Sequence, residues 1–121
     1  MSDFKQLEAW KQSMQLVDQV YDLCKLLPTD ERYGIISQMQ RCSISIPANL
    51  AEGCGRDSTK DFLRHVAISR GSLAELSTFL TFVQRRRFVT PESVTTIEEQ
   101  LETCAKLLGG LRRSLRRKLN L

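Results

Sequence analysis

The chain has 121 residues, of which 41% are hydrophobic and 26% charged, and its formal net charge is +4. This length fits a single domain over residues 1–121, and the composition is typical of soluble globular proteins. No apolar run is long enough to cross a membrane, and the first residues lack the apolar segment of a signal peptide. We therefore expect a cytoplasmic protein with no membrane partner.

Apolar residues recur at alternating steps of three and four along four successive segments of the chain. This spacing is typical of amphipathic helices that cross at shallow angles. No segment alternates with the period of two that a half-buried strand requires, so we expect no strand. The pattern predicts four helices, over residues 5–26, 31–54, 58–87 and 91–119.

The breaks between these segments hold residues that begin or end helices. We expect the second helix to be capped by Thr29 or Asp30, the third by Ser58 and the fourth by Thr90. A left-handed glycine within residues 53–55 should end the second helix. The connections are short, so neighbouring helices must run antiparallel. The predicted fold class is all-α, an up-down-up-down antiparallel four-helix bundle.

The first helix carries two apolar stripes rather than one. Its main seam is assigned to Leu7, Trp10, Met14, Val17, Tyr21 and Cys24. The second stripe consists of Leu16, Val20, Leu23 and Leu27. One core-facing stripe of ordinary width does not hold both sets. The surplus indicates either a wide core or burial against other copies of the chain, and we expect the latter, a homo-oligomer.

The residue types that carry metal and acid–base chemistry are few and scattered. The four cysteines form no C-x-x-C pair, and His65 is the one histidine of the sequence. A zinc site needs four clustered ligands, and a nucleophile needs an adjacent base; this spacing provides neither. We therefore expect reduced, buried thiols, no metal, no cofactor, no catalytic residue and no enzymatic activity.

One stretch of the second helix is more polar than its position explains. Ser45, Asn49 and Glu52 share a helical face, and Arg56 follows Glu52 at the spacing that favours an ion pair. Such a face is either a small binding site or a polar network that fixes the packing register of helices or subunits. We expect the network.

This stretch also carries a resemblance to a known family. Residues 45–53 read Ser-Ile-Pro-Ala-Asn-Leu-Ala-Glu-Gly, and Gly-Arg follows at 55–56. This run resembles the signature of the 23S rRNA intervening-sequence protein family, also called the four helix bundle protein family. Three further blocks resemble the family pattern, at residues 7–10, 28–38 and 71–76.

The resemblance implies a four-helix bundle that assembles as a ring-shaped homopentamer. It also implies that Ser72 and Glu75, from the block at residues 71–76, belong to the same structural or interface network as Ser45 and Asn49. Most members of the family have no assigned activity. A distant bundle relative works with a reverse transcriptase and RNA, which by analogy favours association with nucleic acid.

Basic residues are concentrated towards the end of the chain. No acidic residue occurs from Lys106 onwards, and a second basic cluster, at residues 85–87, should lie at the opposite end of the bundle. These cations either complement helix dipoles on a solvated face or contact phosphates. The candidate nucleic-acid-binding residues are Arg112, Arg113, Arg116, Arg117 and Lys118.

Two functions remain open at the level of the sequence. The first is a non-enzymatic homo-oligomeric bundle that acts as an RNA- or nucleoprotein-binding scaffold. The second is a structural adaptor that binds a partner protein and has no role with nucleic acid. The tail contains no aromatic residue on which bases could stack, so any RNA contact should be directed to the backbone.

Overall fold

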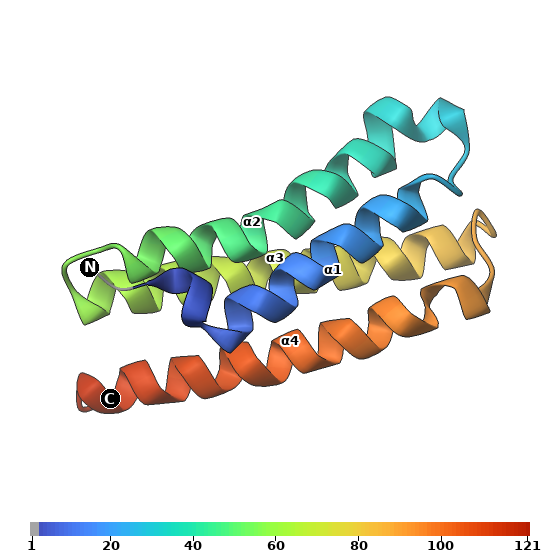
Figure 1. Cartoon of the computed structure of the whole chain (residues 1–121). Helices are drawn as coiled ribbons and strands as arrows, with labels where there is room; N and C mark the ends of the chain where they lie inside the picture. Colours follow the sequence, from blue (N-terminus) through green and yellow to red (C-terminus); the bar gives the residue numbers. More distant parts are fainter. Residues whose placement is uncertain (1–2) are drawn as a thin grey trace.

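A computed structural model describes residues 3–121 and is all-helical over that range, as the apolar spacing predicted (Figure 1). Four long helices make up the bundle, and three short helical segments precede or join them. The long helices are α1 (Glu8–Cys24), α2 (Ser37–Cys54), α3 (Thr59–Arg85) and α4 (Pro91–Lys118). The short segments are η1 (Phe4–Gln6), η2 (Thr29–Glu31) and η3 (Arg32–Ile36).

The four long helices run alternately up and down, and short connections join them (Figure 1). Each packs on the next in chain order, and α4 closes the bundle by packing on α1. A polar contact helps to set the α1–α4 register, because the side-chain amide of Gln100 donates to the backbone carbonyl of Gln12 at 2.9 Å. None of the helices described is long and apolar enough to cross a membrane.

The core contains one apolar stripe from each long helix, but the stripe from α1 is not the one that we assigned as its main seam. Leu16 and Val20, from the second stripe, have no exposed surface. Met14 and Tyr21, from the assigned seam, are 39% and 38% exposed. The assignment of the main seam was therefore wrong, although Val17 and Cys24 at its inner edge are buried.

The later helices begin at the predicted caps. The Ser58 hydroxyl accepts a hydrogen bond from the backbone N–H of Asp61 at 3.0 Å, and that of Thr90 accepts from Ser93 at 3.3 Å. The predicted left-handed stop at residues 53–55 is wrong, because Gly55 has φ −84° and stays in the right-handed region. Positive φ occurs instead at Arg87, after α3, and at Asn120, after α4.

The first two helices begin differently from the prediction. Leu7 is extended, so the expected helix over residues 5–26 is divided into η1 and α1. Neither Thr29 nor Asp30 caps a helix, because both lie within η2, which begins directly after the extended Pro28. Gly34, with φ −111° and ψ −111°, then interrupts the chain inside η3, just before α2. The expected helix over residues 31–54 is thus regular from residue 37.

Candidate nucleic-acid interface

Basic side chains from two helices meet at one end of the bundle. The first turns of α3 and the last turns of α4 lie at the same end, where both described termini also lie (Figure 1). Lys60 and Arg64 of α3 and Arg112 and Arg116 of α4 line an open groove of about 400 Å³. Asp61 is the one carboxylate in this lining. We call this feature the basic groove.

The remaining tail arginines extend the basic groove around α4. Arg113 and Arg117 line an adjoining hollow of about 320 Å³, which shares Arg112 and Arg116 with the basic groove. Arg112 and Arg116 are half-buried, whereas Arg113, Arg117 and Lys118 are exposed. The half-buried pair is thus shared by both hollows, and the exposed residues add charge around it. Lys118 lines neither hollow.

The polar face of α2 is joined to α3 by hydrogen bonds. The side-chain amide of Asn49 donates to the backbone carbonyl of Ser45 at 2.9 Å and to its hydroxyl at 3.1 Å. The Ser72 hydroxyl of α3 donates to the same Ser45 hydroxyl at 2.9 Å. These three side chains thus form one network across the α2–α3 interface.

His65 extends this network, which the sequence did not indicate. Its ring is 3% exposed, and Nδ1 lies 3.0 Å from Oδ1 of Asn49. On the other side of the ring, Nε2 lies 3.3 Å from a guanidinium nitrogen of Arg64, which lines the basic groove. A buried imidazole with a partner on each nitrogen is a satisfied polar group, so its burial is tolerated.

Glu52 and Arg56 form an ion pair within one subunit, at 2.6 Å. The hydrogen bond from Arg56 is the main cause that holds the pKa of the Glu52 carboxyl below its ordinary value. The same carboxylate lies 4.0 Å from Nε2 of His65, at the edge of the network. Glu75 stands apart, because no hydrogen bond or ion pair joins it to these residues within 3–121.

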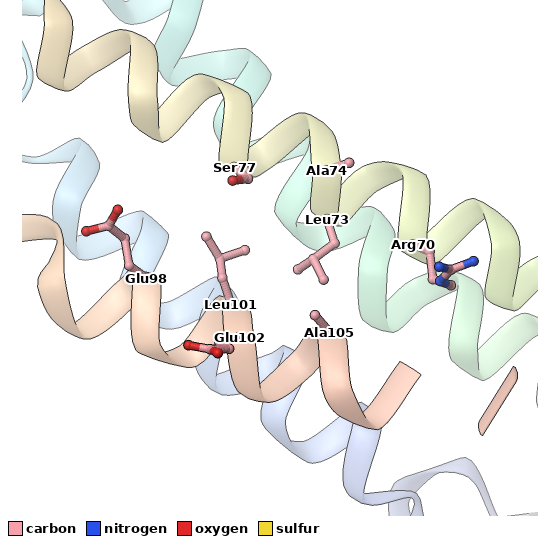
Figure 2. A pocket seen from close by; sticks show the side chains of 8 residues that line it. All are labelled: Arg70, Leu73, Ala74, Ser77, Glu98, Leu101, Glu102 and Ala105. Carbon is pink, nitrogen blue, oxygen red and sulfur yellow. The ribbon is translucent and has the colours of Figure 1, made fainter. Parts of the chain in front are cut away.

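A larger groove of about 490 Å³ lies between the middles of α3 and α4. Leu73 and Leu101 point into it from the two helices, and Arg70 and Glu98 stand at its rim (Figure 2). Across residues 3–121, no three histidine, cysteine or acidic side chains come together as a metal site would require. Four of the eight residues that line this groove are apolar, and three others are charged: Arg70, Glu98 and Glu102.

Comparison with known proteins identifies the family. A family model described as 23S rRNA-intervening sequence protein matches residues 5–110. The chain belongs to this family. No functionally curated protein matches it.

The fold of this 23S rRNA-intervening sequence family member is also that of a solved structure. That structure is a 1.70 Å crystal structure of a protein with unknown function from the S23 ribosomal protein family of Bacteroides thetaiotaomicron. The two superpose with a TM-score of 0.80 at 23% sequence identity, over 87% of this chain and 95% of the other. This likeness supports the four-helix architecture.

In this family member, sequence reasoning missed the residues that α3 contributes to the basic groove. Lys60 and Arg64 are separated from Arg112 by about fifty residues of sequence, and isolated basic residues of this kind are typical of any exposed helix face. His65 was missed for a related reason. It lies beside the apolar positions of α3, and its partner, Asn49, comes from another helix.

Proposed function

We propose that the protein is a non-enzymatic, homo-oligomeric bundle that binds RNA through phosphate contacts in the basic groove. The observation that carries this proposal is the meeting of four cations from α3 and α4 around a single carboxylate. Arginine guanidinium groups match the geometry of phosphate oxygens, and a lysine adds a mobile positive charge. A concave surface of one charge sign also concentrates polyanions near it.

The composition of the groove favours the nucleic-acid backbone over the bases. Its seven described lining residues include no aromatic side chain, so base stacking has no platform there. Contacts to phosphates carry little sequence information, and they release counterions from the nucleic acid. Binding should therefore weaken steeply with salt and depend little on RNA sequence.

Self-association is the second part of the proposal. Three large apolar side chains are about two-fifths or more exposed on α1 and α2: Met14, Tyr21 and Ile44. Burial of such side chains between copies lowers their contact with water. An oligomer, which the family resemblance suggests is a ring-shaped homopentamer, would present several basic grooves on one particle and bind a polyanion by avidity.

The decisive experiment compares charge reversal at the two ends of the bundle. Arg112→Glu/Arg116→Glu changes the basic groove, and Arg85→Glu/Arg86→Glu makes the same change in charge at the far end. Binding of a labelled single-stranded RNA is measured by fluorescence anisotropy over a series of salt concentrations. We expect at least about a tenfold loss of affinity and a shallower salt dependence for the groove variant alone. Equal losses in both variants, or no loss in either, would contradict the proposal.

The alternative function is that of an adaptor for a partner protein. The same exposed side chains of α1 and α2 favour it, because an apolar patch fits a protein partner as well as a second copy. A specific protein that co-purifies after nuclease treatment, and is lost from a Met14→Glu/Tyr21→Glu variant but kept by the groove variant, would favour the adaptor. RNA that is lost only from the groove variant would favour the scaffold.

A further inference from the structure

A continuous chain of hydrogen-bonded side chains leads from the polar face of α2 to the basic groove. It begins at Ser72 and Ser45, passes through Asn49 and His65, and ends at the guanidinium of Arg64. Every link is between 2.9 and 3.3 Å. Arg64 is itself exposed at the groove, whereas the imidazole ring of His65, to which it is hydrogen-bonded, is buried.

The donor and acceptor roles along this series of hydrogen bonds follow from the groups at its two ends, the carbonyl of Ser45 and the guanidinium of Arg64. The Asn49 nitrogen donates to the Ser45 carbonyl, so the Asn49 oxygen must be the atom that faces His65. An amide oxygen only accepts, so Nδ1 of His65 must carry a proton. In the neutral ring Nε2 is then left with a lone pair. The guanidinium of Arg64 only donates, and it meets that lone pair at 3.3 Å.

The residues around the ring keep Nε2 available for Arg64. Glu52 is the nearest carboxylate, 4.0 Å from Nε2, but its oxygen is bound by Arg56 at 2.6 Å. Gly53 lets the backbone of α3 approach α2 closely at His65, because a Cβ atom at this position would lie 2.6 Å from Cβ of His65. The charged groups around the ring are thus Glu52 of α2, its partner Arg56 just after that helix, and Arg64 of α3.

We propose that Asn49 and His65 are positioning residues that hold the guanidinium of Arg64 at the basic groove, ready to bind an RNA phosphate. This inference rests on the proposed function and assigns a role within it to the polar motif of α2. A free arginine side chain samples many rotamers and loses that freedom when it binds. A hydrogen bond that the guanidinium donates to a fixed ring removes part of that loss before the phosphate arrives, because the guanidinium is already ordered.

The first test uses the free protein and follows the single histidine by NMR. Because the sequence contains one histidine, both imidazole ¹⁵N signals belong to His65. We expect the Nδ1–H tautomer in the wild type, and its loss in Asn49→Ala. We also expect a shift of the Nε2 signal in Arg64→Ala. A wild-type ring that is protonated at Nε2, or an Nε2 signal whose chemical shift is unchanged in Arg64→Ala, would overturn the inference.

The second test is a double-mutant cycle on RNA affinity. Arg64→Ala should weaken binding about three- to tenfold and reduce the salt slope by roughly 0.7, the value of one phosphate contact on a single strand. Asn49→Ala should weaken binding by no more than Arg64→Ala does and keep the wild-type salt slope, because the freed guanidinium still reaches the phosphate at a larger cost in conformational entropy. The double variant should bind as Arg64→Ala alone does, because Asn49 acts through Arg64. Losses that multiply in the double variant would overturn the positioning role.

Ser69→Ala provides the matched structural control. Ser69 is buried on α3, and its hydroxyl donates to the carbonyl of Ile46 on α2 at 2.8 Å, so it supports the same interface through a hydrogen bond that does not involve His65. This variant should lose stability and keep the wild-type RNA affinity. A loss of affinity in Ser69→Ala as large as that in Asn49→Ala would show that general loosening of the interface explains the effect of Asn49→Ala, and it would overturn the inference.

The outcomes separate this inference from the proposed function. RNA binding that depends on Arg112 and Arg116, together with independent effects of Asn49→Ala and Arg64→Ala, overturns the positioning role alone. Absence of RNA binding by the wild type overturns both. In that case the NMR experiment still decides whether the ring orders Arg64 in the free protein, which would then be a purely structural contact.

Discussion

At Gly53 the backbone of α2 approaches α3 more closely than a side chain permits. A Cβ atom there would lie 2.6 Å from Cβ of His65 and 3.0 Å from Cδ1 of Phe62. The first of these atoms is attached directly to the α3 backbone and moves only if that helix moves. At Gly55 the nearest atoms to such a Cβ are backbone oxygens at 3.6 Å, an ordinary contact distance.

We predict that Gly53→Ala and Gly55→Ala have different effects on stability. The clash at residue 53 should lower the free energy of unfolding by about 1–3 kcal/mol, because α2 and α3 must separate to relieve it. At residue 55 the change should lie within about 0.5 kcal/mol of the wild type, since the site has space and a right-handed φ. Urea denaturation of both variants measures the difference. Equal stabilities would show that the two helices separate at little cost.

The sequence predicted part of this site and missed the part that depends on another helix. The pairing of Glu52 with Arg56 is local, because the two residues are only four apart in the sequence. The glycine at residue 53 was interpreted as a helix stop, since glycine often has that role. Its actual role is to admit the backbone of α3 at His65, which is visible only when α3 is in place.

At the scale of the element, α1 shows that apolar spacing identifies a helix but does not tell which of two stripes faces the core. Both of its stripes repeat every three or four residues, so periodicity alone does not choose between them. The buried face includes Ala9 and Ser13, which a count of large apolar residues undervalues. Ser13 can be buried in the core because its hydroxyl donates a hydrogen bond to the carbonyl of Ala9 at 2.6 Å. Trp10, on the other stripe, is an aromatic residue that tolerates a half-buried position.

The two stripes of α1 should respond differently to truncation. We predict that Leu16→Ala lowers the free energy of unfolding by about 2–5 kcal/mol, because Leu16 is fully buried and its loss leaves a cavity. Met14→Ala should cost less than about 1 kcal/mol within one subunit, since Met14 is 39% exposed. Chemical denaturation compares the two variants. A larger loss in Met14→Ala would place Met14 in an interface between copies.

Light scattering on the same variants tests self-association separately from stability. If the exposed stripe joins copies, Met14→Ala should lower the mass of the particle in solution, whereas Leu16→Ala should not do so before it unfolds. A wild-type mass of one chain at micromolar concentration would contradict the homo-oligomer.

The ends of helices were predicted best where a cap is local. Ser58 and Thr90 each bond to a backbone N–H three residues ahead, so the residues that make the cap are adjacent in sequence. The start of α2 was predicted poorly, because Gly34 adopts φ and ψ angles that no short-range pattern specifies. Local chemistry therefore explains the starts of α3 and α4 and does not explain the segment that joins α1 to α2.

At the scale of the whole molecule, the charge distribution depends on helix register. The sequence predicted basic residues at opposite ends of the bundle, and antiparallel packing of α3 on α4 places them there (Figure 1). It did not predict that Lys60 and Arg64 meet Arg112 and Arg116, because that meeting depends on how far α4 extends along α3. The core packing that sets this register is distributed over all four helices.

The single core also contains three buried thiols, one each from α1, α2 and α4: Cys24, Cys42 and Cys104. Burial raises the pKa of Cys24 from 9.0 to about 11, and burial, aided by the charge of Glu75, raises that of Cys42 to about 12. Burial also raises the pKa of Cys104, although a hydrogen bond from Ser13 opposes the change. Charging any of these thiols in the folded state is therefore unfavourable.

We predict that the free energy of unfolding falls as the pH rises from about 9 towards about 11. Over this range the unfolded thiols lose their protons while the folded thiols keep them, so the folded state binds more protons and alkali favours unfolding. Urea denaturation at about pH 8 and about pH 10 measures this loss. Cys24→Ala/Cys42→Ala should show a smaller loss between the two pH values, whatever its stability at the lower one. If the double variant keeps the wild-type pH dependence, other titrating groups cause the alkaline loss and the buried thiols do not contribute to it.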